Sequence, residues 1–218
     1  MPKHLQNDLE RLKKAVLEIG TLVEESLTRA IVSLTSRNRA LAEEVIEGDH
    51  EIDRREVLIE EECLKILALH QPVAKDLRFV VAILKLNNDL ERVGDLAVNI
   101  AQRTLTLASA APLPIPEDLV EMAQKARNML IGSFDALIES DPKRAREVCM
   151  ADDEVDMMHR DLFQRFQDEI RKSPQQVEEY VQLLSITRYL ERVADQATNI
   201  AEDVIYMVEG HVVRHHRG

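Results

Sequence analysis

The chain has 218 residues, of which 40 are acidic and 28 are basic, so its formal net charge is −12. Hydrophobic residues make up 45% of the chain, which is enough for a substantial core and argues against disorder. Aromatic residues account for only 3% and tryptophan is absent, which disfavours a sheet-based core. The acidic balance disfavours nucleic acid as a partner, because phosphate backbones are bound by clustered Lys and Arg. A divalent cation or a basic protein surface is the expected partner.

The composition also bears on where the protein works. The sequence contains no apolar run of about 18 residues, so we expect no membrane-spanning helix. The first residues lack the apolar core of a secretory signal peptide. Cys63 and Cys149 lie within helical patterns and are interpreted as reduced thiols beside the core. These features predict a cytoplasmic protein.

Apolar residues recur at steps of three and four along most of the chain, as expected for helices that each bury one stripe. The pattern is interrupted by residues that cap or break helices, namely Asn38, Pro72, the segment Ser140-Asp141-Pro142 and the pair Ser173-Pro174. Three prolines within residues 112–116 exclude a helix there. The predicted helices span about residues 3–36, 39–69, 72–108, 117–139, 142–171 and 174–208.

The two halves of the chain repeat one another. Residues 90–101 read LERVGDLAVNIA and residues 190–201 read LERVADQATNIA, so only three of twelve positions differ. We therefore predict an all-α fold of two tandem, repeat-related three-helix bundles, built from six long antiparallel helices. The expected parts are a first bundle over residues 1–110, a Pro-rich linker over 111–116, a second bundle over 117–210 and a C-terminal tail over 211–218.

Pairs of acidic residues spaced four apart occur in equivalent places of both halves. At 100° per residue, the pairs in the third and sixth helices lie off the apolar stripe, on a flank or the opposite face. Like charges at this spacing repel slightly, so a purely solvated surface would not be expected to keep the pairs in both halves. The pairs are Glu91 with Asp95, Glu191 with Asp195, Asp49 with Asp53, and Asp152 with Asp156.

Antiparallel packing of the second helix beside the third would bring four of these carboxylates together in each bundle. Such a cluster must either take up protons or attract cations. Its hard oxygen ligands suit Mg²⁺, Ca²⁺, Mn²⁺ or iron, and bridging carboxylates would let one cluster hold more than one ion. We therefore predict that the eight carboxylates bind divalent or multinuclear metal. We predict no catalytic residue.

Two alternatives stay open at this point. Glu47-x-x-His50 matches half of the pattern that ferritin-like di-iron oxidoreductases use, although Met150 stands where the second copy would need a Glu. The acid pairs could also lie on the solvated surface of a helical scaffold that binds no metal.

The ordered motifs resemble those of the PhoU family of phosphate-uptake regulators. The matching segments are residues 72–78, 90–101 and 190–202, together with Gly210, and the resemblance covers essentially the whole chain. Family members often have His after the second acid pair, where this chain has Gln196, and Gly94 becomes Ala194 in the second copy. The two sites are therefore expected to differ.

This resemblance implies a cytoplasmic regulator rather than an enzyme. It implies two three-helix bundles that bind metal clusters at their surface, with iron, Mg²⁺, Mn²⁺ and Zn²⁺ as candidate metals. The implied partners are the ATPase subunit of the phosphate ABC transporter and a phosphate-sensing histidine kinase. The protein would be a homodimer, peripheral to the membrane, that restrains phosphate uptake and represses the phosphate regulon when phosphate is plentiful.

Overall fold

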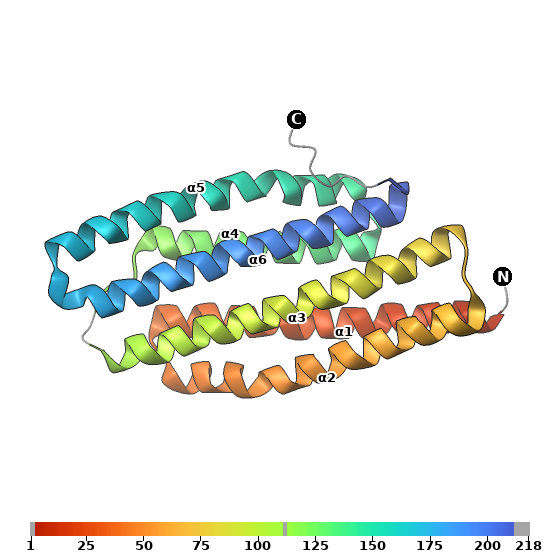
Figure 1. Ribbon diagram of the computed structural model, residues 1–218, viewed down its shortest axis with the longest axis horizontal. Helices are drawn as coiled ribbons and strands as arrows, with labels where there is room; N and C mark the ends of the chain where they lie inside the picture. Colours follow the sequence, from red (N-terminus) through yellow and green to blue (C-terminus); the bar gives the residue numbers. More distant parts are fainter. Residues whose placement is uncertain (1–2, 111–112, 212–218) are drawn as a thin grey trace.

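The computed structural model describes residues 3–110 and 113–211, and it confirms the predicted all-α fold of six long helices (Figure 1). α3 begins at Ala74, two residues after Pro72, and Pro174 opens a short 3₁₀ turn instead of α6. The helices are α1 (Lys3–Ser36), α2 (Arg39–His70), α3 (Ala74–Ser109), α4 (Glu117–Glu139), α5 (Pro142–Lys172) and α6 (Val177–Glu209).

The cap residues singled out in the sequence set several of these boundaries. Asn38 caps α2 by accepting a hydrogen bond of 3.2 Å from the backbone N–H of Leu41. Asp141 caps α5 by accepting a bond of 2.8 Å from the N–H of Lys143, with a proline at the first helical position. Gly210 ends α6 with a φ of 81°, a left-handed conformation that favours glycine.

The six helices form two bundles that lie side by side. α1, α2 and α3 pack together as one bundle, and α4, α5 and α6 as the other. α3 packs against α6 and α1 against α4, so α2 and α5 lie at the two outer faces (Figure 1). The repeat-related bundle architecture is confirmed, whereas the domain limits at residues 110 and 117 stay a prediction. Part of the linker, residues 111–112, and the tail from residue 212 onward lie outside the described residues.

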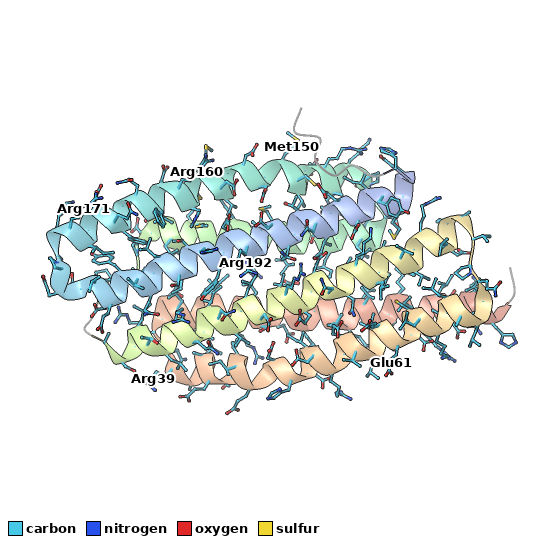
Figure 2. The ribbon with its side chains drawn as sticks, in the orientation of Figure 1. Arg39, Glu61, Met150, Arg160, Arg171 and Arg192 are labelled. Carbon is cyan, nitrogen blue, oxygen red and sulfur yellow. The ribbon has the colours of Figure 1, made fainter. Side chains whose placement is uncertain are left out.

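The outer helices expose both charged and apolar side chains, since Leu69 on α2 is 68% exposed and Met150 on α5 is 77% exposed. Glu61 on α2, and Arg160 and Arg171 on α5, are exposed and point away from the bundles (Figure 2). Within the described part of the chain, no helix combines the length and the apolar character that crossing a membrane requires.

Polar contacts cross between the bundles where α3 meets α6. The ammonium group of Lys85 donates a hydrogen bond of 3.2 Å to Asp203 and lies 5.1 Å from the centre of the Tyr206 ring. Arg103 donates a bond of 3.2 Å to the side-chain oxygen of Gln182. The first part of α3 therefore faces the last part of α6, and the last part of α3 faces the first part of α6. The two central helices run antiparallel.

The contact between α1 and α4 includes a close approach at a glycine of α1. A Cβ atom on Gly20 would lie 2.5 Å from the ring of Phe134, a buried residue of α4. The missing side chain therefore lets the ring pack directly on the α1 backbone.

Replacing Gly20 with Ala is expected to destabilise the protein by about 1–3 kcal/mol, because the Phe134 ring must move away from the added methyl group. Gly48 in α2 is the matched control, since a Cβ there would meet no atom within 4 Å. Gly48→Ala should raise stability by roughly 0.5–1 kcal/mol through helix propensity. Urea unfolding followed by circular dichroism measures both effects, and equal stability of the two variants would contradict this packing.

Candidate metal centre

The two repeated segments occupy equivalent positions on the central helices α3 and α6. Their apolar residues are buried, including Leu90 and Val93 in the first copy and Leu190 and Val193 in the second. By contrast, Glu91 and Glu191 are half-buried, and Asp95 and Asp195 are exposed. The prediction that the acids lie off the core is therefore confirmed.

In the first bundle, carboxylates of α2 and α3 face one another. Burial, and then the charges of Asp53 and Asp95, raise the pKa of Asp49 to about 6. Burial, and then the charges of Asp95, Glu56 and Asp53, raise the pKa of Glu91. Acids from both helices therefore share one region, as antiparallel packing predicted. We call Asp49, Asp53, Glu56, Glu91 and Asp95 the first acidic cluster.

Gly94 lets α2 approach α3 beside this cluster. A Cβ at residue 94 would lie 3.2 Å from Asp49 Oδ1 and 3.3 Å from side-chain carbons of Ile52. Asp49 Oδ1 is buried and accepts no hydrogen bond. A buried carboxylate oxygen that accepts no hydrogen bond and lies among other acids is unfavourable. Binding of a cation or a proton would neutralise the charge of this carboxylate.

Glu56 was not among the predicted ligands, although it continues the acidic stripe of α2 at helical spacing. The buried amide of Asn87 donates a hydrogen bond of 2.8 Å to the backbone oxygen of Glu56 and one of 3.4 Å to its Oε1. Asn87 thereby fixes α2 against α3 at this point. The acid stripe was visible in the sequence, but its contact with Glu91 required the packing of two helices.

The second bundle has a less acidic counterpart, formed by Asp152, Asp156, Glu191 and Asp195, which we call the second acidic cluster. Burial, and then Asp156, raise the pKa of Glu191, while the cation of Arg188 opposes that rise. The equivalents of Glu56 and Glu60 are His159 and Phe163, whose ring centres lie 6.2 Å apart.

The imidazole of His159 adds a neutral group to the second cluster. Burial lowers its pKa, while the nearby carboxylate of Asp156 acts in the opposite direction. Its Nδ1 is buried and has no hydrogen-bond partner. The two clusters therefore differ in charge and in the kind of ligand atoms they offer.

The structure brings the eight predicted ligands into two regions but does not converge them into a preformed site. Within residues 3–110 and 113–211, no three Asp, Glu, His or Cys side chains are placed so that they could hold a metal ion. Gln196, which follows the second acid pair in sequence, is 8% exposed with its Oε1 buried. It therefore lies inside the packing rather than on the exposed strip that carries Asp195.

The other candidate groups are exposed to solvent or chemically inert. Glu47 and His50 are both exposed on α2, whereas the di-iron motif of ferritin-like proteins projects into the bundle. Cys63 and Cys149 are free thiols. Burial raises the pKa of Cys63 to about 12 and that of Cys149 to about 11, so neither is a reactive thiolate near neutral pH.

The fold and the site define a class of all-α protein with two repeat-related bundles, each carrying carboxylates between its second and third helices. The family model of the PhoU domain matches this chain twice, over residues 16–104 and 119–204. The chain therefore belongs to the PhoU family, as the sequence motifs indicated.

Individual relatives agree over nearly the whole length. A phosphate-specific transport system accessory protein PhoU homolog from Aquifex aeolicus is 38% identical over 211 residues, covering 97% of this chain and 96% of that protein. The crystal structure of PhoU from Pseudomonas aeruginosa is 33% identical with a TM-score of 0.92, over 94% of this chain and 99% of that one. The crystal structure of the phosphate transport system regulatory protein PhoU from Streptococcus pneumoniae is 31% identical in sequence, with a TM-score of 0.89. The match covers 96% of this chain and 99% of that chain.

Replacing Asp49 with Asn is expected to stabilise the metal-free protein at pH 7. Folding raises the pKa of Asp49 from its ordinary 3.8 to about 6, so the folded protein favours the protonated carboxyl. The contribution of this group to the free energy of unfolding is fully present below about pH 4 and is lost as the pH rises through 6, where the buried carboxyl must ionise. The free energy of unfolding of the Asn variant should exceed that of the wild type by about 1 kcal/mol at pH 7, after allowance for solvent screening. At pH 4 the two should be almost equal. Urea unfolding with a chelator present measures this difference. Asp153→Asn, at an exposed position of α5, is the control and should change little at either pH.

Proposed function

We propose that this protein is a metal-binding regulator of phosphate uptake and phosphate signalling, and that it acts as an adaptor rather than an enzyme. The observation that carries the proposal is the match of both bundles to the PhoU domain. The relatives are named as accessory or regulatory proteins of phosphate transport, and the similarity extends over nearly the whole of each chain.

The proposed partners are the ATPase subunit of the phosphate ABC transporter and a phosphate-sensing histidine kinase. The protein would work in the cytoplasm as a homodimer and would contact this machinery peripherally. It would restrain uptake and repress the phosphate regulon when phosphate is plentiful. The packing of the two bundles leaves the outer faces of α2 and α5 uncovered, so these faces are available to partners.

The carboxylates of the two clusters are the proposed metal ligands. In the first cluster, burial and mutual repulsion disfavour the charged forms of Asp49 and Glu91, so a cation that neutralises them would be bound favourably. The buried, unbonded Oδ1 of Asp49 supports the fit. A bound ion would supply positive charge, with Mg²⁺, Mn²⁺, iron and Zn²⁺ as candidates. The ligands would have to change rotamer, because the described side chains do not converge on one point. The proposed ligands are Asp49, Asp53, Glu91, Asp95, Asp152, Asp156, Glu191 and Asp195.

A metal-free helical scaffold is the second candidate, favoured by the lack of a preformed metal site among the described residues. Such a protein would purify without metal when no chelator is used. Its melting temperature would not respond to Mg²⁺ or Mn²⁺. It could still regulate phosphate uptake, so metal content and regulation are tested separately.

The double variant Glu91→Ala, Asp95→Ala is expected to stay folded and to lose metal. Neither side chain belongs to the core, and removing an i,i+4 pair of like charges relieves a few tenths of a kcal/mol of repulsion. Elemental analysis of purified protein measures the metal, and thermal unfolding checks the fold. Glu43→Ala, Glu47→Ala is the matched control, because it removes an exposed acid pair of equal spacing from α2. Equal metal in the two double variants would refute the site assignment.

Deleting the gene is expected to turn on a phosphate-starvation reporter even when phosphate is plentiful. The wild-type gene should restore repression, and so should the Glu43→Ala, Glu47→Ala control. The Glu91→Ala, Asp95→Ala variant should fail to restore it if metal is required. A silent reporter in the deletion strain would rule out the regulator itself, whereas full complementation by the acid variant would rule out only the requirement for metal at these residues.

A further inference from the structure

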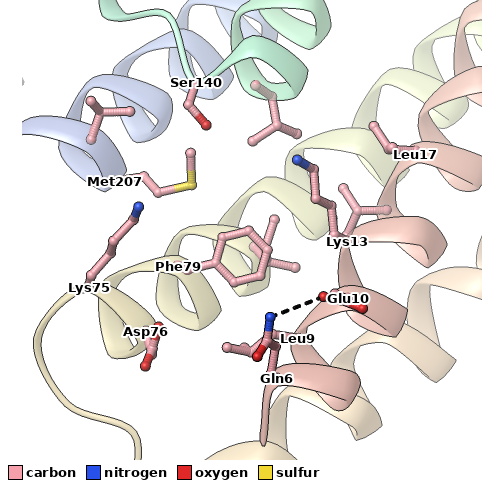
Figure 3. Close-up of a pocket in the computed structure, with 14 residues that line it drawn as sticks. Gln6, Leu9, Glu10, Lys13, Leu17, Lys75, Asp76, Phe79, Ser140 and Met207 are labelled. Atoms are coloured by element: carbon pink, nitrogen blue, oxygen red, sulfur yellow. Dashed lines mark hydrogen bonds between the residues drawn. The ribbon is translucent and has the colours of Figure 1, made fainter. Parts of the chain in front are cut away.

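A groove of about 500 Å³ lies where four helices from both bundles meet (Figure 3). The N-terminal halves of α1 and α3 form one side, and the C-terminal ends of α4 and α6 form the other. Its volume is within the range of pockets that hold small organic ligands, and junctions between domains are a common place for them. None of its lining residues belongs to either acidic cluster.

The floor of the groove is apolar and is not covered by the rest of the chain that the structure describes. Phe79 of α3 lies near the middle, between Leu9 of α1 and Met207 of α6 (Figure 3). Phe79 and Leu9 are only partly buried, and the neighbouring Val208 is 37% exposed. A ligand with an apolar body would remove this surface from water.

Two lysines stand at the mouth of the groove. Lys13 projects from α1 and Lys75 from the first turn of α3, and both are exposed. Neither forms an ion pair among the described residues, whereas the adjacent Lys14 pairs with Glu18 at 3.8 Å. Val73 provides no side-chain cap for α3, so the helix dipole adds partial positive charge beside Lys75.

The charges at the mouth are separated into two sides. Figure 3 shows the ammonium groups of Lys13 and Lys75 turned toward the side of the groove that carries Ser140. Asp76 and Glu10 lie on the opposite side, where Glu10 accepts a hydrogen bond of 3.4 Å from Gln6. An anionic group would therefore be favoured on the Ser140 side, next to the apolar floor.

We propose that this groove binds a single-chain anionic amphiphile. Its alkyl or acyl chain would lie against Phe79, Leu9 and Met207, and its carboxylate or phosphate head would bind between Lys13 and Lys75. Inorganic phosphate alone would leave the apolar floor exposed to water, and a cationic amphiphile would be repelled by the lysines. The ligand would contact helices of both bundles. This inference does not depend on the metal site or on the proposed role in phosphate uptake.

Calorimetric titration of the full chain with decanoate and decyl phosphate, both below micelle formation, tests the ligand class. Each is expected to bind once per chain, whereas decyltrimethylammonium and inorganic phosphate should not bind measurably. Affinity should rise about fourfold per added methylene from octanoate to decanoate, because each buried CH₂ contributes a nearly constant transfer free energy. An affinity independent of chain length, or equal binding of the cationic amphiphile, would overturn the proposal. So would binding to vesicles of anionic phospholipid without binding of the free single-chain anions, since that result would mark a membrane-facing surface.

Lysine variants test the position of the site. The double variant Lys13→Gln, Lys75→Gln changes two exposed side chains, so it should fold normally, and it should bind decanoate at least about tenfold more weakly. Lys14→Gln is the matched control, because this lysine is adjacent in sequence, exposed and outside the groove, and it should bind like wild type. Circular dichroism spectra with and without ligand verify that the fold is kept. Unchanged affinity in the double variant would place the binding elsewhere and refute the assignment.

Discussion

The enclosure of α3 and α6 by neighbouring helices is the constraint on which the rest of the structure depends. Each central helix packs against two helices of its own bundle and against the other central helix. The part of each central helix that carries the acid pair lies beside α2 in the first bundle and beside α5 in the second. The core therefore decides where the carboxylates stand. Their mutual repulsion amounts to a few tenths of a kcal/mol per pair, whereas each buried Leu or Val contributes about 1.5–3 kcal/mol.

The duplication gives both bundles one backbone plan, but single residues make the two halves differ. Gly94 admits the Asp49 carboxylate against the α3 backbone, and the second copy has Ala194 at that place. Where α3 meets α6, the repeat-equivalent residues Arg103 and Asp203 carry opposite charges. Arg103 donates a hydrogen bond to Gln182 of α6, and Asp203 accepts one from Lys85 of α3. Divergence after the duplication has therefore given the two ends of the α3–α6 interface different polar contacts. The same divergence leaves the second cluster less acidic than the first.

The sequence was sufficient to predict the helices, their order and the side of α3 that carries the acids. These features follow from local rules: cap residues such as Asn38 and Asp141 set the ends, and the 3.6-residue period sets the buried face. It was not sufficient for the contacts between bundles, such as Lys85 with Asp203 and the Phe134 ring on Gly20. A helical wheel identifies which residues avoid the core, but not which of them meet a second bundle. Gln196 shows this limit, since it directly follows the exposed Asp195 in sequence but is itself buried by packing.

The arrangement of the helices also determines where a change in cluster charge can act. α2 and α5 contact only helices of their own bundle, whereas α1, α3, α4 and α6 hold the two bundles together. Each cluster lies between a central helix and an outer one, so neutralising it changes the repulsion across the α2–α3 or α5–α6 contact and leaves the α3–α6 contacts intact. The outer helix is then the element whose packing a change in cluster charge affects most directly. A signal that originates in the clusters would therefore emerge on the outer faces of the protein, whereas a ligand in the groove would act on the packing of one bundle against the other.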